Sequence, residues 1–157
     1  MVIQPATVND VTAICELADQ INAIHHRELP DMFTDPEDTK GSEEFWLNQL
    51  EAKNSAFLVA KIQNSVVGFI TAKLNENTEI PFLVSSKVCR VGTVVVSETY
   101  QNQGVGSKLM SSIENWAKKY GAKDIHLTVM EFNKNAHSFY ENNGYIPTSR
   151  IMAKSIA

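Results

Sequence analysis

The sequence has little of what secreted, membrane-spanning or nucleic-acid-binding proteins need. Its 157 residues contain two cysteines, Cys15 and Cys89, which are too few for a disulfide framework. The formal net charge is −4, whereas a sequence-independent nucleic-acid binder needs a basic face. No apolar run approaches the length of a membrane span, and no basic stretch followed by an apolar one suggests a signal peptide. These absences predict a cytoplasmic protein that binds neither membranes nor nucleic acid.

The stretch from Val88 to Tyr120 is typical of a strand, a loop and a helix in succession. The β-branched run VCRVGTVVV indicates a buried strand, and the polar SETYQNQ ends it. Apolar residues then recur at the spacing of one helix face: Leu109, Met110, Ile113, Trp116 and Ala117. A glycine-bearing loop therefore joins the strand to the helix.

This loop has the properties of an anion site. The first N–H groups of a helix have no partner inside it, and the helix dipole places partial positive charge there. Gly104 and Gly106 would let a phosphate approach the backbone without meeting a β-carbon. The pattern favours a diphosphate ligand, although a plain strand-to-helix turn would also use glycine.

Two well-known phosphate loops do not fit these residues. The ATP-binding loop requires a glycine five residues before Gly106, and none is there. The dinucleotide fingerprint requires a small residue at the position of Leu109. A nucleotide-phosphate binder of either kind is thus disfavoured.

Two motifs resemble those of the GCN5-related N-acetyltransferases. QNQGVG at 101–106 follows a valine-rich strand and fits [RQ]-x-x-G-x-[GA], the acetyl-CoA loop of that family. NKNAHSFYENNGY at 133–145 is similar to the family's N-x-x-A-x-x-[FL]-Y-E-x-x-G-[FY]. The resemblance is strong from about Val94 to Tyr145 and weak elsewhere. It implies an acetyl-CoA-dependent N-acetyltransferase, with acetyl-CoA as co-substrate and no metal.

The order of predicted elements indicates an α/β fold built as one domain over residues 1–157. The expected elements are an edge strand at 2–6, helices at 7–25 and from 42, a hairpin of 56–62 with 66–74, a strand at 88–96, a helix at 107–120, a strand at 125–130, a short helix at 135–142 and closing strands within 145–154. Such an order gives a mixed sheet with helices on both faces. The resemblance further implies a mostly antiparallel sheet whose splayed strands, 88–96 and 125–130, hold the acyl-CoA.

The resemblance also implies which residues hold the cofactor. Backbone groups of Val94 and Val96 would pair with the pantetheine arm, and an amide near Val94 or Val95 would stabilise the oxyanion. The diphosphate would lie on the amides of seven successive residues: Gln101, Asn102, Gln103, Gly104, Val105, Gly106 and Ser107. Asn133 either contacts the cofactor or caps the helix that follows it.

Tyr140 is the predicted general acid. Acetyl transfer to an amine needs a neutral amine, a stabilised oxyanion and a proton for the leaving thiolate. A tyrosine hydroxyl can hydrogen-bond the thiolate and protonate it, and the resembling motif places this tyrosine at the thioester sulfur. The competing interpretation is that Tyr140 is an aromatic residue that only packs at the start of the closing strands.

The general base is less defined. Many relatives carry a glutamate two residues before the first cofactor-pairing position, where this chain has Gly92. Five residues are candidate replacements: His25, His26, Glu28, Glu131 and His126. The alternative is a reaction that uses the small neutral fraction of the amine and no dedicated base.

The segment from residue 28 to 44 favours a cationic acceptor. It carries seven acids against Lys40, with Arg27 just before it: Glu28, Asp31, Asp35, Glu37, Asp38, Glu43 and Glu44. Negative potential there would attract a polyamine, an aminoglycoside or a peptide amine, whereas an ordinary solvated loop is the simpler interpretation. Other hypotheses remain open: a CoA-binding sensor without catalysis, and a homodimer by analogy with relatives.

Overall fold

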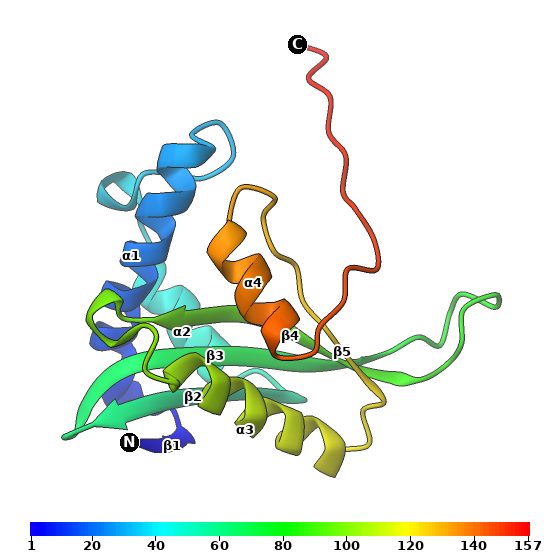
Figure 1. The fold of residues 1–157 in the computed structure, drawn as a ribbon, viewed down its shortest axis with the longest axis horizontal. Coiled ribbons are helices and arrows are strands. Elements are labelled where there is room, and N and C mark those ends of the chain that lie inside the picture. The colour runs from blue at the N-terminus through cyan, green and yellow to red at the C-terminus, as the bar shows by residue number, and fades with distance from the viewer.

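The computed structural model describes all 157 residues and contains one five-stranded sheet in the order β1-β2-β3-β4-β5 (Figure 1). The strands are β1 (Val2–Pro5), β2 (Ser55–Ile62), β3 (Ser65–Glu76), β4 (Lys87–Val96) and β5 (Asp124–His126). The helices are α1 (Val11–Glu28), α2 (Ser42–Leu50), α3 (Val105–Lys119) and α4 (Lys134–Asn142). All neighbouring strands are antiparallel except β4 and β5, which are parallel. No helix combines the length and the apolar character needed to cross a membrane.

Helices cover both faces of the sheet, as predicted. On one face, Leu109, Met110 and Ile113 of α3 are fully buried against β2, β3 and β4, and residues of α4 pack beside them. On the other face, α1 and α2 bury a second cluster in which the Trp46 ring lies 5.2 Å from that of Phe69. The predicted mixed, mostly antiparallel α/β fold is therefore confirmed.

A β-bulge interrupts β4 at Gly92. Thr71 of β3 pairs with Thr93, but Ala72 pairs with Val91, so Gly92 has no partner. The Thr71 hydroxyl accepts a hydrogen bond from the Thr93 N–H at 3.0 Å. A β-carbon on Gly92 would lie 2.9 Å from that hydroxyl oxygen. Position 92, where the resembling family often has a glutamate, is therefore so closely packed that a side chain would fit only after rearrangement.

β4 and β5 pair along only three residues. The ladder runs from Val88 with Asp124 to Arg90 with His126, and the two segments then separate. The prediction of a strand over 125–130 is therefore wrong after His126, because Leu127 to Val129 make no backbone hydrogen bond. The second half of β4 is left with one open side.

The predicted closing strands within 145–154 are also wrong for the single chain. Residues 146–157 make no backbone hydrogen bond to any other residue and are exposed throughout. They leave the body after α4 as an extended segment (Figure 1). A strand needs a neighbouring strand, and within one copy this segment has none. The connection between β3 and β4 projects beyond the end of the sheet as a long arm (Figure 1).

Candidate active site

The loop from Gln101 to Ser107 presents a run of unpaired backbone donors. None of the seven N–H groups in this run donates a hydrogen bond to the protein, and the next N–H, that of Lys108, bonds to the Gly104 carbonyl at 3.1 Å. Residues 101–104 are exposed. Gly104 precedes α3 with φ of +81°, in the left-handed region that glycine adopts without strain. The geometry is that of an accessible anion site at a helix N-terminus.

Two glutamine side chains hold this loop against the segment before it. Gln101 Nε2 donates to the Val96 carbonyl at 3.3 Å, and Gln103 Nε2 donates to the Thr99 carbonyl at 3.0 Å. Both side chains therefore turn toward the preceding segment. No acidic side chain occupies the first turn of α3, so nothing there competes with an anionic ligand for the dipole.

The open side of β4 faces the gap left by β5. The N–H of Thr93 bonds to β3, and so does the N–H of Ser97, which reaches the Val67 carbonyl at 2.9 Å. Because hydrogen-bonding direction alternates along a strand, Val94 and Val96 direct their backbone groups away from β3 and into the gap. By the same alternation, the Val95 N–H points toward β3.

A cavity of about 110 Å³ lies where β4 ends. Its lining comes from β4, the following loop and α1: Gln20, Ile21, Ile24, Val94, Val95, Val96, Glu98 and Gln101. The sequence did not indicate the contribution of α1, since Ile21 and Ile24 follow the helical repeat of an ordinary core face. Only the fold brings these residues to the end of β4.

Tyr140 lies on α4 with a half-buried ring and a hydroxyl that bonds to no protein atom. Its ring packs edge-on against Phe139 at 5.1 Å and Tyr145 at 5.9 Å. No polar side-chain atom of the protein is both buried and unpaired, so the Tyr140 hydroxyl remains accessible. Burial of the ring raises the pKa of Tyr140 above its ordinary value, which keeps the phenol protonated at neutral pH. Tyr145 differs, because its hydroxyl donates to Glu114 Oε1 at 3.3 Å.

Asn133 caps α4. Its Oδ1 accepts a hydrogen bond from the Ala136 N–H at 3.1 Å, which is the capping interpretation considered from the sequence. One turn on, His137 Nε2 donates to the Met130 carbonyl at 2.9 Å. These two bonds fix the chain where it enters α4.

The two histidines at the end of α1, His25 and His26, differ in their hydrogen bonds. His26 is engaged at both nitrogens, since Nδ1 donates to the Phe33 carbonyl at 2.7 Å and Nε2 lies 3.6 Å from Asp35 Oδ2. His25 donates from Nδ1 to the Ile21 carbonyl at 2.8 Å and leaves Nε2 without a protein partner. In the neutral ring, that nitrogen carries a free lone pair.

Aromatic contacts connect His25 to two other segments of the chain. Its ring lies 4.7 Å from that of Phe33, in the segment after α1, and 5.4 Å from that of Phe132, in the segment before α4. The end of α1 therefore touches the chain that carries the second motif, which sequence spacing did not reveal.

The remaining candidate bases lie on the surface. Glu131 is exposed and lies 3.5 Å from Arg150 and 4.0 Å from Lys134. Glu28 lies 3.7 Å from Arg27, and His126 is exposed at the end of β5. Solvent and existing ion pairs surround these groups, in contrast to the half-buried His25.

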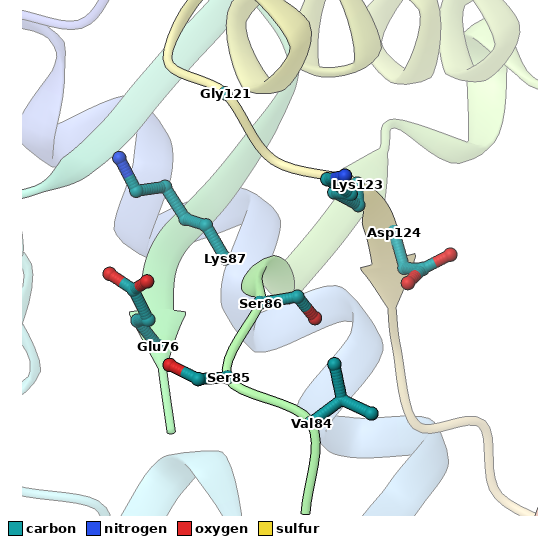
Figure 2. A pocket seen from close by; sticks show the side chains of 8 residues that line it. All are labelled: Glu76, Val84, Ser85, Ser86, Lys87, Gly121, Lys123 and Asp124. Atoms are coloured by element: carbon teal, nitrogen blue, oxygen red, sulfur yellow. The ribbon is translucent and has the colours of Figure 1, made fainter. Parts of the chain in front are cut away.

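A larger hollow of about 540 Å³ lies at the opposite end of β4 (Figure 2). It is lined by Glu76, Val84, Ser85, Ser86, Lys87, Gly121, Lys123 and Asp124. Charges of both signs surround it, and Lys87 Nζ is already bonded to the Tyr120 carbonyl at 2.9 Å. None of the motif residues contributes to it, so the smaller cavity is the better candidate for the chemistry. No group of three or more histidine, cysteine or acidic side chains could hold a metal ion.

Solved structures share this fold. A mutant of the BH1408 protein from Bacillus halodurans aligns over 100% of both chains with a TM-score of 0.93 and 24% identity. The aminoglycoside acetyltransferase AAC(6')-Iy, solved with a bisubstrate analogue of CoA, aligns over 99% of this chain and 97% of its own with a TM-score of 0.76 and 15% identity. The fold is thus one that acetyltransferases adopt.

Sequence comparison identifies the family. Residues 19–145 match the model of the acetyltransferase (GNAT) family, and the chain belongs to that family. It is 29% identical over 149 residues to YhfO of Bacillus subtilis, an uncharacterized N-acetyltransferase. The alignment covers 92% of this chain and 89% of the relative. It is 28% identical over 106 residues to an N-alpha-acetyltransferase of Sulfurisphaera tokodaii, of which it spans 62%. The protein is accordingly an acyltransferase enzyme of the N-acetyltransferase class.

Proposed function

We propose that this enzyme transfers the acetyl group of acetyl-CoA to a primary amine by direct attack within a ternary complex. One observation carries the proposal: seven successive unpaired N–H groups, from Gln101 to Ser107, open beside a strand whose backbone faces a gap. A ligand in which a diphosphate is joined to an extended, amide-bearing arm suits both features. CoA has that construction. We further propose that residues 1–157 act as a single domain, in the cytoplasm, as a homodimer.

The cofactor would lie along β4 as an added strand. Amides of Val94 and Val96 and their carbonyls would pair with the pantetheine arm, and the loop amides would hold the diphosphate with help from the α3 dipole. Gln101 would release the Val96 carbonyl, because the arm supplies its own amide in place of the Gln101 side chain. The Asn133 Nδ2 group, which the helix cap leaves free, would be available to the arm.

The reaction would proceed through a tetrahedral oxyanion. The amine nitrogen attacks the thioester carbon, the carbonyl oxygen gains the charge, and a backbone N–H stabilises it. The alternation along β4 favours the Val94 amide over that of Val95 for this task. When the carbon–sulfur bond breaks, the Tyr140 hydroxyl donates its proton to the CoA thiolate. The accessible, unpaired and protonated state of that hydroxyl supports the assignment.

Among the candidate bases, we favour His25. Its Nε2 has a free lone pair, its ring contacts the entry to α4, and His26 next to it is occupied at both nitrogens. His25 would accept a proton from the attacking ammonium, directly or through a water molecule. His25→Gln and His26→Gln form a matched pair, of which only the first should lower kcat without changing acetyl-CoA affinity.

The acceptor would be cationic. Glu28, Asp31, Glu37 and Asp38 are exposed. The turn at Pro36–Asp38 contacts α1, and Asp35 just before it lies 3.6 Å from His26. A polyamine, an aminoglycoside or a peptide amine would be attracted by this potential, and raising the salt concentration should then increase KM for the amine.

A two-stage assay tests the proposed function. Thermal shift with acetyl-CoA, CoA and ATP is followed by measurement of thiol release over an amine panel. Stabilisation by acetyl-CoA and CoA together with thiol release is the expected outcome. Stabilisation without release for any amine would favour a CoA-binding sensor, and stabilisation by ATP alone would overturn the cofactor assignment.

A further inference from the structure

Two polar or charged residues are buried in this protein, Asp10 and Thr71. Asp10 is bonded to Lys61 and Thr7 at the start of α1, which accounts for its burial. Thr71 lies within β3 with 8% of its surface exposed, and its hydroxyl accepts a hydrogen bond from the Thr93 N–H at 3.0 Å. A valine of the same shape would fill this place without burying a polar group, so the hydroxyl points to a use for the bond.

The bond lies at the bulge in β4. Thr71 is opposite Thr93, and the bulged residue Gly92 has no partner in β3. In a regular antiparallel ladder, an N–H that points at the neighbouring strand donates to a backbone carbonyl. The Thr93 N–H donates instead to a side-chain oxygen. The Thr71 side chain therefore closes the ladder at the point where the bulge interrupts it.

Gly92 leaves room for this side chain. A β-carbon at position 92 would lie 2.9 Å from the Thr71 hydroxyl oxygen, which is closer than a β-carbon can approach without a shift of one of the two. The hydroxyl thus occupies the space that a side chain on residue 92 would enter. Glycine at 92 and a hydroxyl at 71 therefore depend on each other.

The bonded N–H directly precedes the one that the proposed reaction uses. Val94 follows Thr93 in β4, and its N–H is the proposed donor to the oxyanion. Because successive N–H groups of a strand point to opposite sides, a Thr93 N–H held toward β3 directs the Val94 N–H into the gap. An oxyanion donor is effective only when it already points at the place where the charge develops. The direction of this one N–H therefore matters for the rate.

We propose that Thr71 is a positioning residue for acetyl transfer: its hydroxyl holds the Thr93 N–H and thereby aims the Val94 N–H at the oxyanion. This role rests on the proposed function and deepens it. Thr71 acts through the backbone of β4. Its loss should lower kcat and leave the affinity for acetyl-CoA nearly unchanged, because the charge on the oxyanion exists only in the transition state and the amides of the anion site are unaltered.

Thr71→Val and Thr71→Ser test the hydroxyl. Valine keeps the shape and leaves the Thr93 N–H without an acceptor, so we expect kcat with the best amine of the panel to fall on the order of 10–10²-fold. Serine keeps the hydroxyl and should restore most of the rate. The Kd for acetyl-CoA, measured by calorimetry, should stay nearly the same in both variants. Wild-type kcat in Thr71→Val, or a serine variant as slow as the valine variant, would overturn the proposal.

Thr7→Val is the matched control. It removes a hydroxyl that donates to Asp10 Oδ2 at 3.0 Å, at the start of α1 and away from β4. It should lower the stability of the protein to urea without lowering kcat. A fall in kcat as large as that of Thr71→Val would show that the rate follows stability alone, which would contradict a positioning role.

A second variant disturbs the same bond from the other strand. Gly92→Ala places a methyl group 2.9 Å from the hydroxyl oxygen, so the hydroxyl has to move away from the Thr93 N–H. Gly92→Ala should therefore lower kcat when Thr71 is present. In the Thr71→Ala background that oxygen is gone, and adding Gly92→Ala should lower kcat no further. Losses that multiply in the double variant would contradict a shared cause.

Amide hydrogen exchange separates the bond from the proposed function. The Thr93 N–H should exchange about tenfold faster or more in Thr71→Val and be protected again in Thr71→Ser. Equal exchange in the wild type and Thr71→Val would overturn the proposal whatever the kinetics. A wild-type protein that acetylates no amine would overturn the proposed function and the oxyanion role with it, while the exchange rates would still show whether Thr71 holds β4.

Discussion

The ring of Phe139 lies directly over Gly106. A β-carbon on Gly106 would sit 3.1 Å from Cζ and 3.2 Å from Cε2 of that ring. Gly106 is in the first turn of α3, where the candidate anion site lies, and Phe139 is the neighbour of Tyr140 on α4. The two motifs that the sequence separates by some thirty residues therefore meet at this contact, which is too tight for a β-carbon at position 106 unless the ring shifts.

Gly106→Ala should disturb both halves of the site. The added methyl group must displace the Phe139 ring by a few tenths of an ångström, which moves α4 relative to the loop. We expect a higher Kd for acetyl-CoA and a lower kcat, measured by calorimetry and steady-state kinetics. Phe139→Leu introduced into the same variant should relieve the overlap and restore part of both. Wild-type values in Gly106→Ala would show that the contact is irrelevant to the site.

Gly104→Ala should weaken cofactor binding through the backbone. Gly104 and Gly121 have φ of +81° and +82°, and neither has an atom within 4 Å of an added β-carbon. Alanine at either position should thus cost about 1–2 kcal/mol of stability through the left-handed conformation alone. Only Gly104→Ala changes the loop, so only that variant should raise the Kd for acetyl-CoA. Equal Kd values for the two variants would count against the anion site.

Tyr140→Phe should lower kcat by about 10²–10⁴-fold and leave the Kd for acetyl-CoA nearly unchanged, because only proton donation is lost. The acid must be protonated to act, and burial raises the pKa of Tyr140 above its ordinary value of 10.0. The wild-type rate should therefore not decline on the alkaline side until the pH exceeds 10. Tyr145→Phe is the matched control, since it removes a hydroxyl bonded to Glu114 and should affect stability more than turnover. Unchanged turnover in Tyr140→Phe would remove this residue from the mechanism.

Asp10→Asn should destabilise the protein at neutral pH. Asp10 is buried where α1 begins, and its carboxylate lies 2.6 Å from Lys61 Nζ and accepts two hydrogen bonds from Thr7. We expect a loss of about 1–3 kcal/mol in the free energy of unfolding, measured with urea. Combining Asp10→Asn with Lys61→Met should cost less than the sum of the two single changes, because neither charge is then left unpaired. Additive losses would show that the pair is not coupled.

The Asp10 carboxylate also makes the stability of the folded protein depend on pH. Burial raises the pKa of Asp10, but the hydrogen bonds from Lys61 and Thr7 outweigh it, so the pKa lies below its ordinary value of 3.8. A depressed pKa stabilises the folded state at pH above the ordinary value, and this contribution is lost as the pH falls through the folded value. The stability difference between wild type and Asp10→Asn should thus shrink only below about pH 4.

Local patterns predicted the centre of this fold well. The valine-rich strand, the glycine loop and α3 follow from residue types and spacing between Val88 and Tyr120, and the hairpin of β2 and β3 likewise. The bulge at Gly92 was not predictable, since it depends on how Thr71 meets β4 across the sheet. The closing strands within 145–154 were predicted wrongly, because residues 146–157 have the composition of a strand but lie beside no neighbouring strand.

The site shows the same division. The two motifs were enough to predict the loop and Tyr140 as candidate site residues, because each motif is a local pattern in the sequence. The packing of His25 between Phe33 and Phe132 joins three segments that are distant in the chain, and no local pattern encodes such a contact. Preferring His25 over His26 likewise required knowledge of their hydrogen bonds. These bonds depend on how α1 ends and on how the following loop folds back.

Backbone amide shifts measured by NMR test the anion site most directly. The protein labelled with ¹⁵N is titrated with CoA and, separately, with pantetheine, which has the same arm and no diphosphate. The N–H signals of Gln101 to Ser107 should move strongly with CoA and little with pantetheine, while those of Val94 and Val96 should move with both. Amides at 101–107 that do not respond to CoA, or that respond equally to pantetheine, would contradict a diphosphate held at the start of α3.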